Sequence, residues 1–378
     1  MVKDLLTIIG TILFAVVIVE ALNVLLFIII RYFVRTVLKF NVIENWVGDS
    51  KKRKRIAQVT VILCLVGFAI WNIVNTIIVV VHWDVFFFVA ELLEKGIQKI
   101  SGKKSKYYWQ GALAIAALIL YLGTGYYNAF HVSETNYQLK TSKDIGDKAL
   151  RVVQISDSHL GTTFDGKGFA KHLEKIQKTN PDIVVVTGDF VDDGTSKEDM
   201  VEGCKALGKL KTTYGTYMIW GNHDKGYYSS RNYSLDDIEK ELKKNNIKTL
   251  KDETVLLGDK IYLIGRLDRS FVERKSADTL VKDLDKSKYM IMLDHQPNDY
   301  DAEEKTEVDL VLSGHSHGGQ MIPIGITGEL SGANDKTYGL EKRNKTTFIV
   351  NSGISDWAIY FKTGTFSEYG VIDIANEG

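Results

Sequence analysis

Histidine, aspartate and asparagine side chains recur in five short blocks between residues 157 and 317. Carboxylate oxygens, amide oxygens and imidazole nitrogens together suit divalent ions such as manganese, iron or zinc. A single tetrahedral ion would not need seven such ligands, but two ions a few ångströms apart would use them if they shared one carboxylate. The candidate ligands, among which Asp189 is the expected bridge, are Asp157, His159, Asp189, Asn222, His295, His315 and His317.

Two metal ions held in this way would serve phosphoester chemistry. Such a pair binds a bridging hydroxide together with the non-bridging oxygens of a phosphate, and the hydroxide attacks the phosphorus in line. The ions neutralise the negative charge that develops during the attack. Any block alone is weak support, because an isolated Asp-x-His or Gly-His-x-His sequence is commonly a turn or a surface loop. The joint occurrence of all five blocks is what predicts a metal centre.

A β-strand is predicted before each block. The chain is organised around residues 183–186, a run of apolar β-branched residues that is followed by Thr187, Gly188 and Asp189. A short run of this kind, bounded by turn residues, is typical of a strand buried on both faces. Because ligands of open α/β sheets bind at the carboxyl ends of the strands, we expect the blocks to converge there. Comparable runs precede the other blocks, at residues 150–155, 216–220, 290–293 and 308–313.

The rest of this region alternates between helical and strand patterns. Ser234 and Asp237 resemble a capping box at the start of a helix. Units of strand, helix and strand followed by a strand-rich half predict two packed sheets with helices outside. Apolar residues recur at helical spacing around 169–176, 200–210 and 235–242, and strand patterns follow at 254–257, 260–265, 289–293, 308–313, 347–350 and 369–374.

The first 130 residues carry long runs with few charges, which predict membrane spans. Basic residues cluster between these runs, at 31–56 and 95–106. Three spans would leave the two basic stretches on opposite faces, whereas four spans, with a hairpin turning near residues 72–75, would place both in the cytoplasm. The positive-inside rule therefore favours four spans, a multi-pass cell-membrane protein and a catalytic domain outside the cytoplasm. The apolar runs lie at residues 5–30, 57–81 and 107–130.

These patterns divide the chain into three parts: a transmembrane segment at 1–131, a linker with a first strand at 132–149, and a soluble domain at 150–378. The formal net charge is zero, so the charge balance does not indicate a nucleic-acid partner. The basic run at 51–55 is interpreted as a loop that faces lipid. The two cysteines predict no disulfide framework.

Taken together, the five blocks resemble the calcineurin-like metallophosphoesterases. They stand in that family's order, with suitable spacing, across residues 150–374. The sequence Gly318-Gly319-Gln320 after the last block is similar to the bacterial membrane-associated branch, which includes transmembrane metallophosphoesterases and lipid A precursor pyrophosphatases. The resemblance implies an α/β fold, namely a four-layer αββα sandwich, preceded here by an all-α transmembrane segment.

The resemblance also implies a role for each candidate residue. His223 would be the histidine that protonates the leaving-group oxygen without binding metal, and Asp224 would orient its ring. Asp192 is interpreted as helix-leading or as a neighbour of the ligands, and Asp294 as exposed. The cofactors would be two divalent ions, with Mn²⁺ expected first and iron or zinc as alternatives. One ion would be held by Asp157, His159, Asp189 and His317, and the other by Asp189, Asn222, His295 and His315.

We therefore predict a membrane-anchored enzyme that hydrolyses phosphoester, phosphodiester or pyrophosphate bonds. A short connection to the last span would keep its site near the headgroup layer, which favours a substrate linked to lipid or envelope glycan. Loops such as 225–234 and 324–346 would provide specificity. One alternative is a metal-binding scaffold without activity on the same fold, against which the presence of His223 argues. A transporter is a third reading, but the spans show neither paired charges nor repeats.

Overall fold

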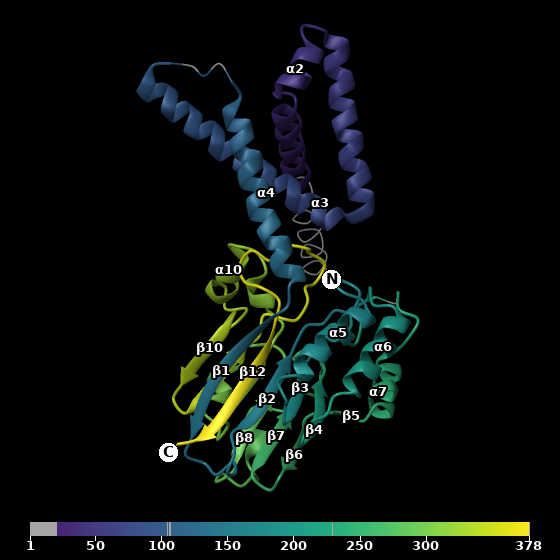
Figure 1. Ribbon diagram of the computed structural model, residues 1–378, viewed down its shortest axis with the longest axis vertical. Coiled ribbons are helices and arrows are strands. Elements are labelled where there is room, and N and C mark those ends of the chain that lie inside the picture. The colour runs from purple at the N-terminus through teal and green to yellow at the C-terminus, as the bar shows by residue number, and fades with distance from the viewer. Residues whose placement is uncertain (1–20, 104, 106, 229, 378) are drawn as a thin grey trace, which may run out of the picture. The chain divides into compact units, whose positions relative to one another are not determined.

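Two compact units make up the chain in the computed structural model, which describes residues 21–103, 105, 107–228 and 230–377. The first unit runs from Met1 to Gly123 and the second from Thr124 to Gly378. Figure 1 shows the first unit as a set of helices, and the second as β-sheets with flanking helices. The predicted α/β fold, preceded by long apolar helices, is thereby confirmed.

Local sequence signals explain where the helices of the first unit begin and end. Ser50 caps the longest helix, because its Oγ accepts a hydrogen bond from the backbone N–H of Arg53 at 3.3 Å. Gly102 ends the same helix in the left-handed conformation, with φ of 68°. The helices are Ala21–Val37, α2 (Asn41–Val47), α3 (Lys51–Ser101) and α4 (Trp109–Phe130), the end of which belongs to the second unit.

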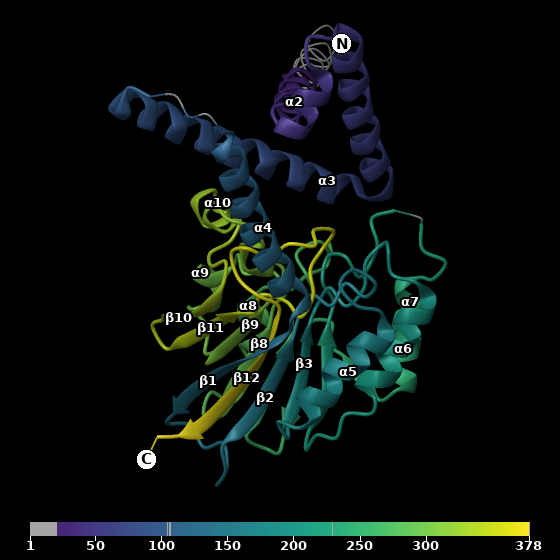
Figure 2. The same ribbon diagram turned by 45° about the horizontal axis from the view of Figure 1, so that its top comes forward.

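Helix α3 is broken at Asn72, whose φ of −154° and ψ of 95° are not helical. The side chain of Asn72 restarts the helix, since its Oδ1 accepts a hydrogen bond from the backbone N–H of Asn75 at 3.0 Å. Figures 1 and 2 show that α3 changes direction along its length. The break coincides with the segment 72–75, where the sequence predicts the turn of a membrane hairpin.

Two helices of the described chain, α3 and α4, are long and apolar enough to cross a membrane. The bent pair Ala21–Val37 and Asn41–Val47 would make a third if it counted as one span. Residues 1–20, which hold most of the first predicted span, lie outside the described part. Large apolar side chains face outward in this unit, with Trp71 84% and Ile70 82% exposed. Such exposure is typical of a surface that contacts lipid.

Two six-stranded sheets form the second unit. The centre of the first sheet is parallel, while β12 runs antiparallel to β2 and pairs in parallel with β1 at the edge. Its strand order is β1 (Ser133–Thr141), β12 (Glu368–Asn376), β2 (Leu150–Ile155), β3 (Ile183–Thr187), β4 (Gly215–Ile219) and β5 (Ile247–Thr249). The order of the second is β10 (Gly339–Arg343), β11 (Thr346–Val350), β9 (Leu310–Ser313), β8 (Tyr289–Leu293), β7 (Ile261–Gly265) and β6 (Glu253–Leu257).

Helices cover the outer faces of the two sheets, which completes the four layers that the sequence predicts. Figure 2 shows α5, α6 and α7 together on one side of the sheets. Ser234 begins α7 with the expected capping box, in which its side chain and that of Asp237 each bond the other's backbone. The helices are α5 (Gly166–Gln177), α6 (Lys197–Leu207), α7 (Leu235–Lys244), α8 (Ala277–Val281), α9 (Tyr300–Glu303), the 3₁₀ turn η1 (His317–Gly319) and α10 (Ile324–Leu330).

Alternate residues of β3 hold the layers together. Ile183 and Val185 belong to the core between the two sheets, whereas Val184 and Val186 belong to the core beneath α5 and α6. All four are fully buried, and burying a side chain of this size contributes about 1.5–3 kcal/mol. Strand β3 is therefore fixed by packing on both of its faces. This packing also fixes the start of the loop that carries Asp189.

Candidate metal centre

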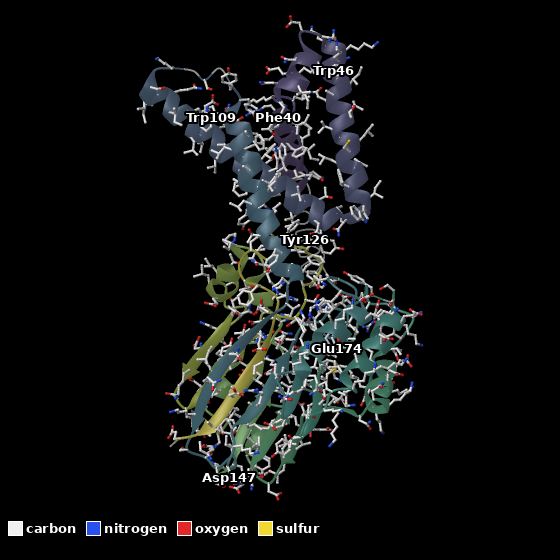
Figure 3. All side chains as sticks on the ribbon, viewed as in Figure 1. Phe40, Trp46, Trp109, Tyr126, Asp147 and Glu174 are labelled. Atoms are coloured by element: carbon white, nitrogen blue, oxygen red, sulfur yellow. The ribbon has the colours of Figure 1, made fainter. Side chains whose placement is uncertain are left out.

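The predicted ligands lie at one end of the second unit, because each ligand loop leaves the carboxyl end of a strand. The loops follow β2, β3 and β4 of the first sheet and β8 and β9 of the second, and within each set the strands are parallel neighbours. Asp147, labelled in Figure 3, stands just before β2 and so marks the opposite end of that strand. The topology thus brings together residues that are far apart in the sequence.

Asp157, His159 and His317 form one buried group, whose nearest ligand atoms all lie within 4.8 Å of one another. His317 Nε2 is 3.7 Å from Asp157 Oδ1. The rings of His159 and His317 stack with their centroids 5.1 Å apart. One carboxylate and two imidazoles therefore face a common point.

Asp189, His295 and His315 form a second group within the same 4.8 Å limit. His295 Nδ1 donates a hydrogen bond to the carbonyl oxygen of Thr187 at 2.8 Å, which turns Nε2 toward the group. Asn222 joins the group, because its Oδ1 lies 3.1 Å from His295 Nε2. Its amide nitrogen donates to the Tyr227 hydroxyl at 2.8 Å, so its oxygen is the atom left for a metal.

Asp189 lies between the two groups. Its Oδ2 is 3.2 Å from His295 Nε2, in the second group, and 3.6 Å from His159 Nε2, in the first. Its Oδ1 accepts a hydrogen bond from the backbone N–H of His223 at 2.8 Å, which fixes the carboxylate plane. One oxygen thus faces both groups, the position that a bridging ligand requires.

The backbone is strained at most of the candidate ligands. Positive φ is uncommon for residues other than glycine and gathers at functional sites, where the surrounding structure holds it in place. The strain therefore marks the same end of the sheets independently of residue type. Five candidate ligands have positive φ: Asp157 (51°), His159 (34°), Asp189 (53°), His315 (69°) and His317 (48°).

Glycines allow the ligand loops to approach one another closely. A Cβ on Gly221 would stand 2.1 Å from Asp189 Oδ1, and a Cβ on Gly314 would stand 1.7 Å from Ser156 Oγ. Gly188, with φ of 91°, lies so close to His295 that a Cβ would be 2.6 Å from its Nδ1. No larger residue fits at these three positions without moving a ligand.

The donor set fits divalent metal ions. His159 Nε2 and His315 Nδ1 are buried and have no hydrogen-bond partner among the described residues, and an unpaired buried nitrogen is unfavourable unless it binds something. Burial alone would lower the pKa of His295, but the Asp189 carboxylate raises it well above its ordinary value. For Asp189 the directions are reversed. Burial alone would raise the pKa of its carboxyl, but the imidazoles of His295 and His159 lower that pKa below the usual range. The site therefore favours bound positive charge.

His223 borders a cavity of about 570 Å³ beside the two groups. The imidazole ring of His223 is half-buried. Its centroid lies 5.1 Å from the ring centroids of His159 and Tyr227 and 5.4 Å from that of Trp357. Burial is the main cause that lowers the pKa of His223, and the Asp189 carboxylate partly opposes it. The cavity also has Tyr228 on its wall, so aromatic side chains line much of the space that His223 faces.

The likeness to known proteins agrees with this geometry. A family model described as calcineurin-like phosphoesterase matches residues 150–319. The uncharacterized metallophosphoesterase YkuE of Bacillus subtilis is 31% identical over 256 residues, which are 65% of this chain and 87% of that protein. The chain belongs to the calcineurin-like phosphoesterase family. Membership of this family implies divalent metal ions.

Two further relatives show how far the likeness extends. An uncharacterized metallophosphoesterase of Campylobacter jejuni is 33% identical over 232 residues, 60% of this chain. A Danio rerio protein named transmembrane protein with metallophosphoesterase domain is 28% identical over 239 residues, 58% of this chain. The chain spans 59% of the length of the first of these proteins and 52% of the second.

Asp224 contacts backbone groups of two ligand loops, whereas the resemblance implies that it orients the ring of His223. Its Oδ2 accepts hydrogen bonds from the backbone N–H groups of Asp189 at 2.9 Å and Gly221 at 2.8 Å, and its Oδ1 accepts one from Val191 at 3.1 Å. Both oxygens are occupied by backbone donors, so Asp224 ties two ligand loops together instead of orienting the His223 ring. Burial, with the neighbouring Asp189 charge, raises the pKa of Asp224 to about 7.

Two acids stand behind the ligand histidines of the first group. Asp192, which the sequence indicates as a possible neighbour, has Oδ2 at 3.4 Å from His159 Nδ1. Asp356, which sequence reasoning missed, has Oδ1 at 3.7 Å from His317 Nδ1. The sequence signal for Asp356 is its place shortly after the predicted strand 347–350 and after Gly353, a glycine that has φ of 84° in the structure.

The expectation that Asp294 is exposed was wrong. Its side chain is 1% exposed and pairs with Arg266, whose Nη1 lies 2.9 Å from Asp294 Oδ2. Arg274 binds the same oxygen. The sequence next to Asp294 does not show its burial, because its two arginine partners come from a loop that is distant in the sequence.

Proposed function

We propose that the chain is a membrane-anchored, dinuclear metal-dependent phosphoesterase. The observation that carries this proposal is the single oxygen of Asp189 that faces both groups of ligands. Mn²⁺ is the proposed ion at both positions, with iron and zinc as the alternatives for a mixed oxygen and nitrogen donor set. One ion is assigned to Asp157, His159, Asp189 and His317, and the other to Asp189, Asn222, His295 and His315.

When bound, the two ions would provide Lewis acidity and would neutralise charge on the phosphate. The protein's own residues provide the geometry. Thr187 and Tyr227 orient His295 and Asn222 through the hydrogen bonds described above, so the ligand atoms are placed in advance. His223 faces the cavity from the edge of the site, where it would hold a proton for the leaving-group oxygen.

The leaving group is assigned to the cavity beside His223. Its walls include Tyr227, Tyr228 and Trp357, and its charged lining residues are the acids Asp192 and Asp193. Aromatic faces suit a ring or an alkyl group. Part of the predicted specificity loop 225–234 thus borders the cavity, whereas the segment 324–346 contains α10 and lines other hollows.

Membrane anchoring is supported by α3 and α4 and by the Danio rerio relative, whose name describes a transmembrane protein. The end of α4 leads into the phosphoesterase unit, because α4 ends at Phe130 and β1 begins at Ser133, with only two residues between them. A substrate linked to lipid or envelope glycan fits an enzyme tethered in this way, since tethering raises encounter with substrates in the same layer. The catalytic unit is assigned to the extracytoplasmic face of the cell membrane.

The function is tested with the full-length protein in detergent, loaded with Mn²⁺. His223→Ala should retain two bound ions per chain and lose turnover by on the order of a hundredfold. The loss should be smaller for nitrophenyl esters, whose leaving group departs without a proton. Bound ions without turnover on any phosphomonoester, diester or pyrophosphate would instead support a scaffold.

The substrate class is tested in mixed micelles. Lipid-linked phosphates should be hydrolysed faster than their soluble headgroup analogues at equal bulk concentration. A soluble nucleotide as the best substrate of the full-length protein would contradict the assignment.

A further inference from the structure

Lys362 is fully buried at the edge of the metal centre. Its Nζ lies 3.0 Å from Oδ1 of Asp356, which is also fully buried. The ammonium further donates a hydrogen bond to the carbonyl oxygen of Ser352 at 2.7 Å. A lysine is almost never buried completely unless it is paired. The pair stands in the loop between β11 and β12, which leaves the carboxyl end of β11 in the second sheet.

The carboxylate of this pair reaches a candidate metal ligand. Asp356 Oδ1 is 3.7 Å from His317 Nδ1, and that ring nitrogen is buried without a hydrogen-bond partner among the described residues. An ion bound through Nε2 leaves the ring proton on Nδ1, which then needs an acceptor. Asp356 Oδ1 is placed to accept that proton after a small approach, and the Lys362 ammonium holds the same oxygen at 3.0 Å.

The backbone of Lys362 is bound to the end of α4. Its N–H donates to the carbonyl oxygen of Gly125 at 2.9 Å, and its carbonyl oxygen accepts from Asn128 Nδ2 at 3.2 Å. Gly125 permits this contact, because a Cβ there would stand 2.7 Å from Thr363 Cγ2. Tyr126, labelled in Figure 3, lies in the same turn of α4, and its ring meets that of Phe361 at 6.5 Å.

We infer that Lys362 is a positioning residue that links the end of α4 to the metal centre through Asp356 and His317. This inference rests on the proposed function, since it takes His317 as a metal ligand. Stability alone does not account for the pair, because well-packed apolar side chains usually replace a buried ion pair without loss of stability. The affinity of the group Asp157, His159 and His317 for metal should therefore depend on how the end of α4 is docked.

The test titrates Mn²⁺ into metal-free, full-length protein in detergent and follows two binding events by calorimetry. Lys362→Met should weaken one event by about tenfold to a hundredfold, the range for removing a group that orients a ligand. The other event, assigned to Asp189, His295 and His315, should not change. Lys362→Arg, which keeps the charge, should restore part of the lost affinity.

A matched control separates positioning from a general loss of stability. Lys143 forms an ion pair with Asp309 at 2.7 Å and bonds the carbonyl oxygen of Lys288, away from the ligand loops. Lys143→Met should lower the melting temperature of the metal-free protein and leave both binding events as in wild type. Equal weakening of both events in Lys362→Met, or no weakening, would overturn the inference. A wild type that binds none of Mn²⁺, iron and zinc would instead overturn the proposed function.

The link to α4 has a test of its own, which also serves if Lys362→Met does not fold. In Gly125→Ala the new methyl group would stand 2.7 Å from Thr363 Cγ2, so the Thr363 side chain next to Lys362 must move and the same binding event should weaken. Gly123→Ala places a methyl group on the same helix with nothing within 4 Å and should bind like wild type. Identical Mn²⁺ binding by these two variants would show that the end of α4 does not act on the site.

Discussion

Replacing Gly314 with alanine should disable the metal group that contains Asp157 without unfolding the protein. The added Cβ would stand 1.7 Å from Ser156 Oγ and 2.4 Å from Asp157 Oδ2, whereas ordinary contact begins at 3.4 Å. The carboxylate must therefore retreat by about 1 Å, several times the roughly 0.2 Å by which metal–ligand distances vary. His317, which faces the same carboxylate, would lose its partner in the group.

The expected size of the effect follows from this displacement. The affinity of that group for Mn²⁺ should fall by on the order of a hundredfold, and a misplacement of about 1 Å should lower turnover by a similar factor. Overpacking should also lower the free energy of unfolding by about 1–3 kcal/mol. Calorimetric titration of Mn²⁺ measures the first quantity, steady-state kinetics the second, and denaturant unfolding of the metal-free protein the third.

Gly370→Ala is the matched control, because it adds the same methyl group to a buried glycine with ordinary contacts, the nearest being Asn351 Nδ2 at 3.6 Å. It should bind Mn²⁺ and turn over substrate like wild type. If Gly314→Ala bound both ions with the affinity of this control, the close approach between the two ligand loops would not be essential, and the reasoning would be refuted.

Three further predictions follow from the other features of the molecule. Asp189→Ala should remove both ions, because its carboxylate faces both groups, and elemental analysis that found two ions per folded chain would contradict the bridge. The proposed topology puts the catalytic unit outside the cytoplasm, so a cysteine at Asn376 should react with an impermeant label on intact cells and one at Lys51 should not. The reverse result would place the unit inside. Asp373 pairs with Arg151 at 2.7 Å, and this hydrogen bond lowers the pKa of the carboxyl. Its stabilisation is therefore present above the unfolded-state pKa and lost as pH falls through the lower folded-state pKa, so Asp373→Asn should unfold about 0.5–1 kcal/mol more easily at neutral pH and match wild type in acid.

The chain combines a candidate metal site in its second unit with long apolar helices in its first unit. The family to which the chain belongs accounts for a metal-dependent site, and the long apolar helices suit a membrane. Within the second unit, hydrogen bonds join the end of α4 to the loop of Lys362.

The sequence by itself determined the strands, the candidate ligands and the family. A run such as 183–186 has apolar residues on both faces and can be buried only between two layers, so its strand and its place in the middle of the sheet follow from composition. Candidate metal ligands are recognisable because only a few residue types offer suitable atoms, and here such residues recur after the strands. The break at Asn72 was also predictable, since its side chain caps the helix that follows it.

Only the tertiary structure decided which groups surround those ligands. Asp224, Asp294 and Asp356 are all aspartates near predicted ligands, yet one ties two loops together, one is held by arginines and one stands behind His317. Their roles depend on which loops meet at the ends of the two sheets, and those loops are far apart in the sequence. The function of a buried carboxylate is set by the donors within hydrogen-bonding distance, and the packing of the two sheets brings those donors together.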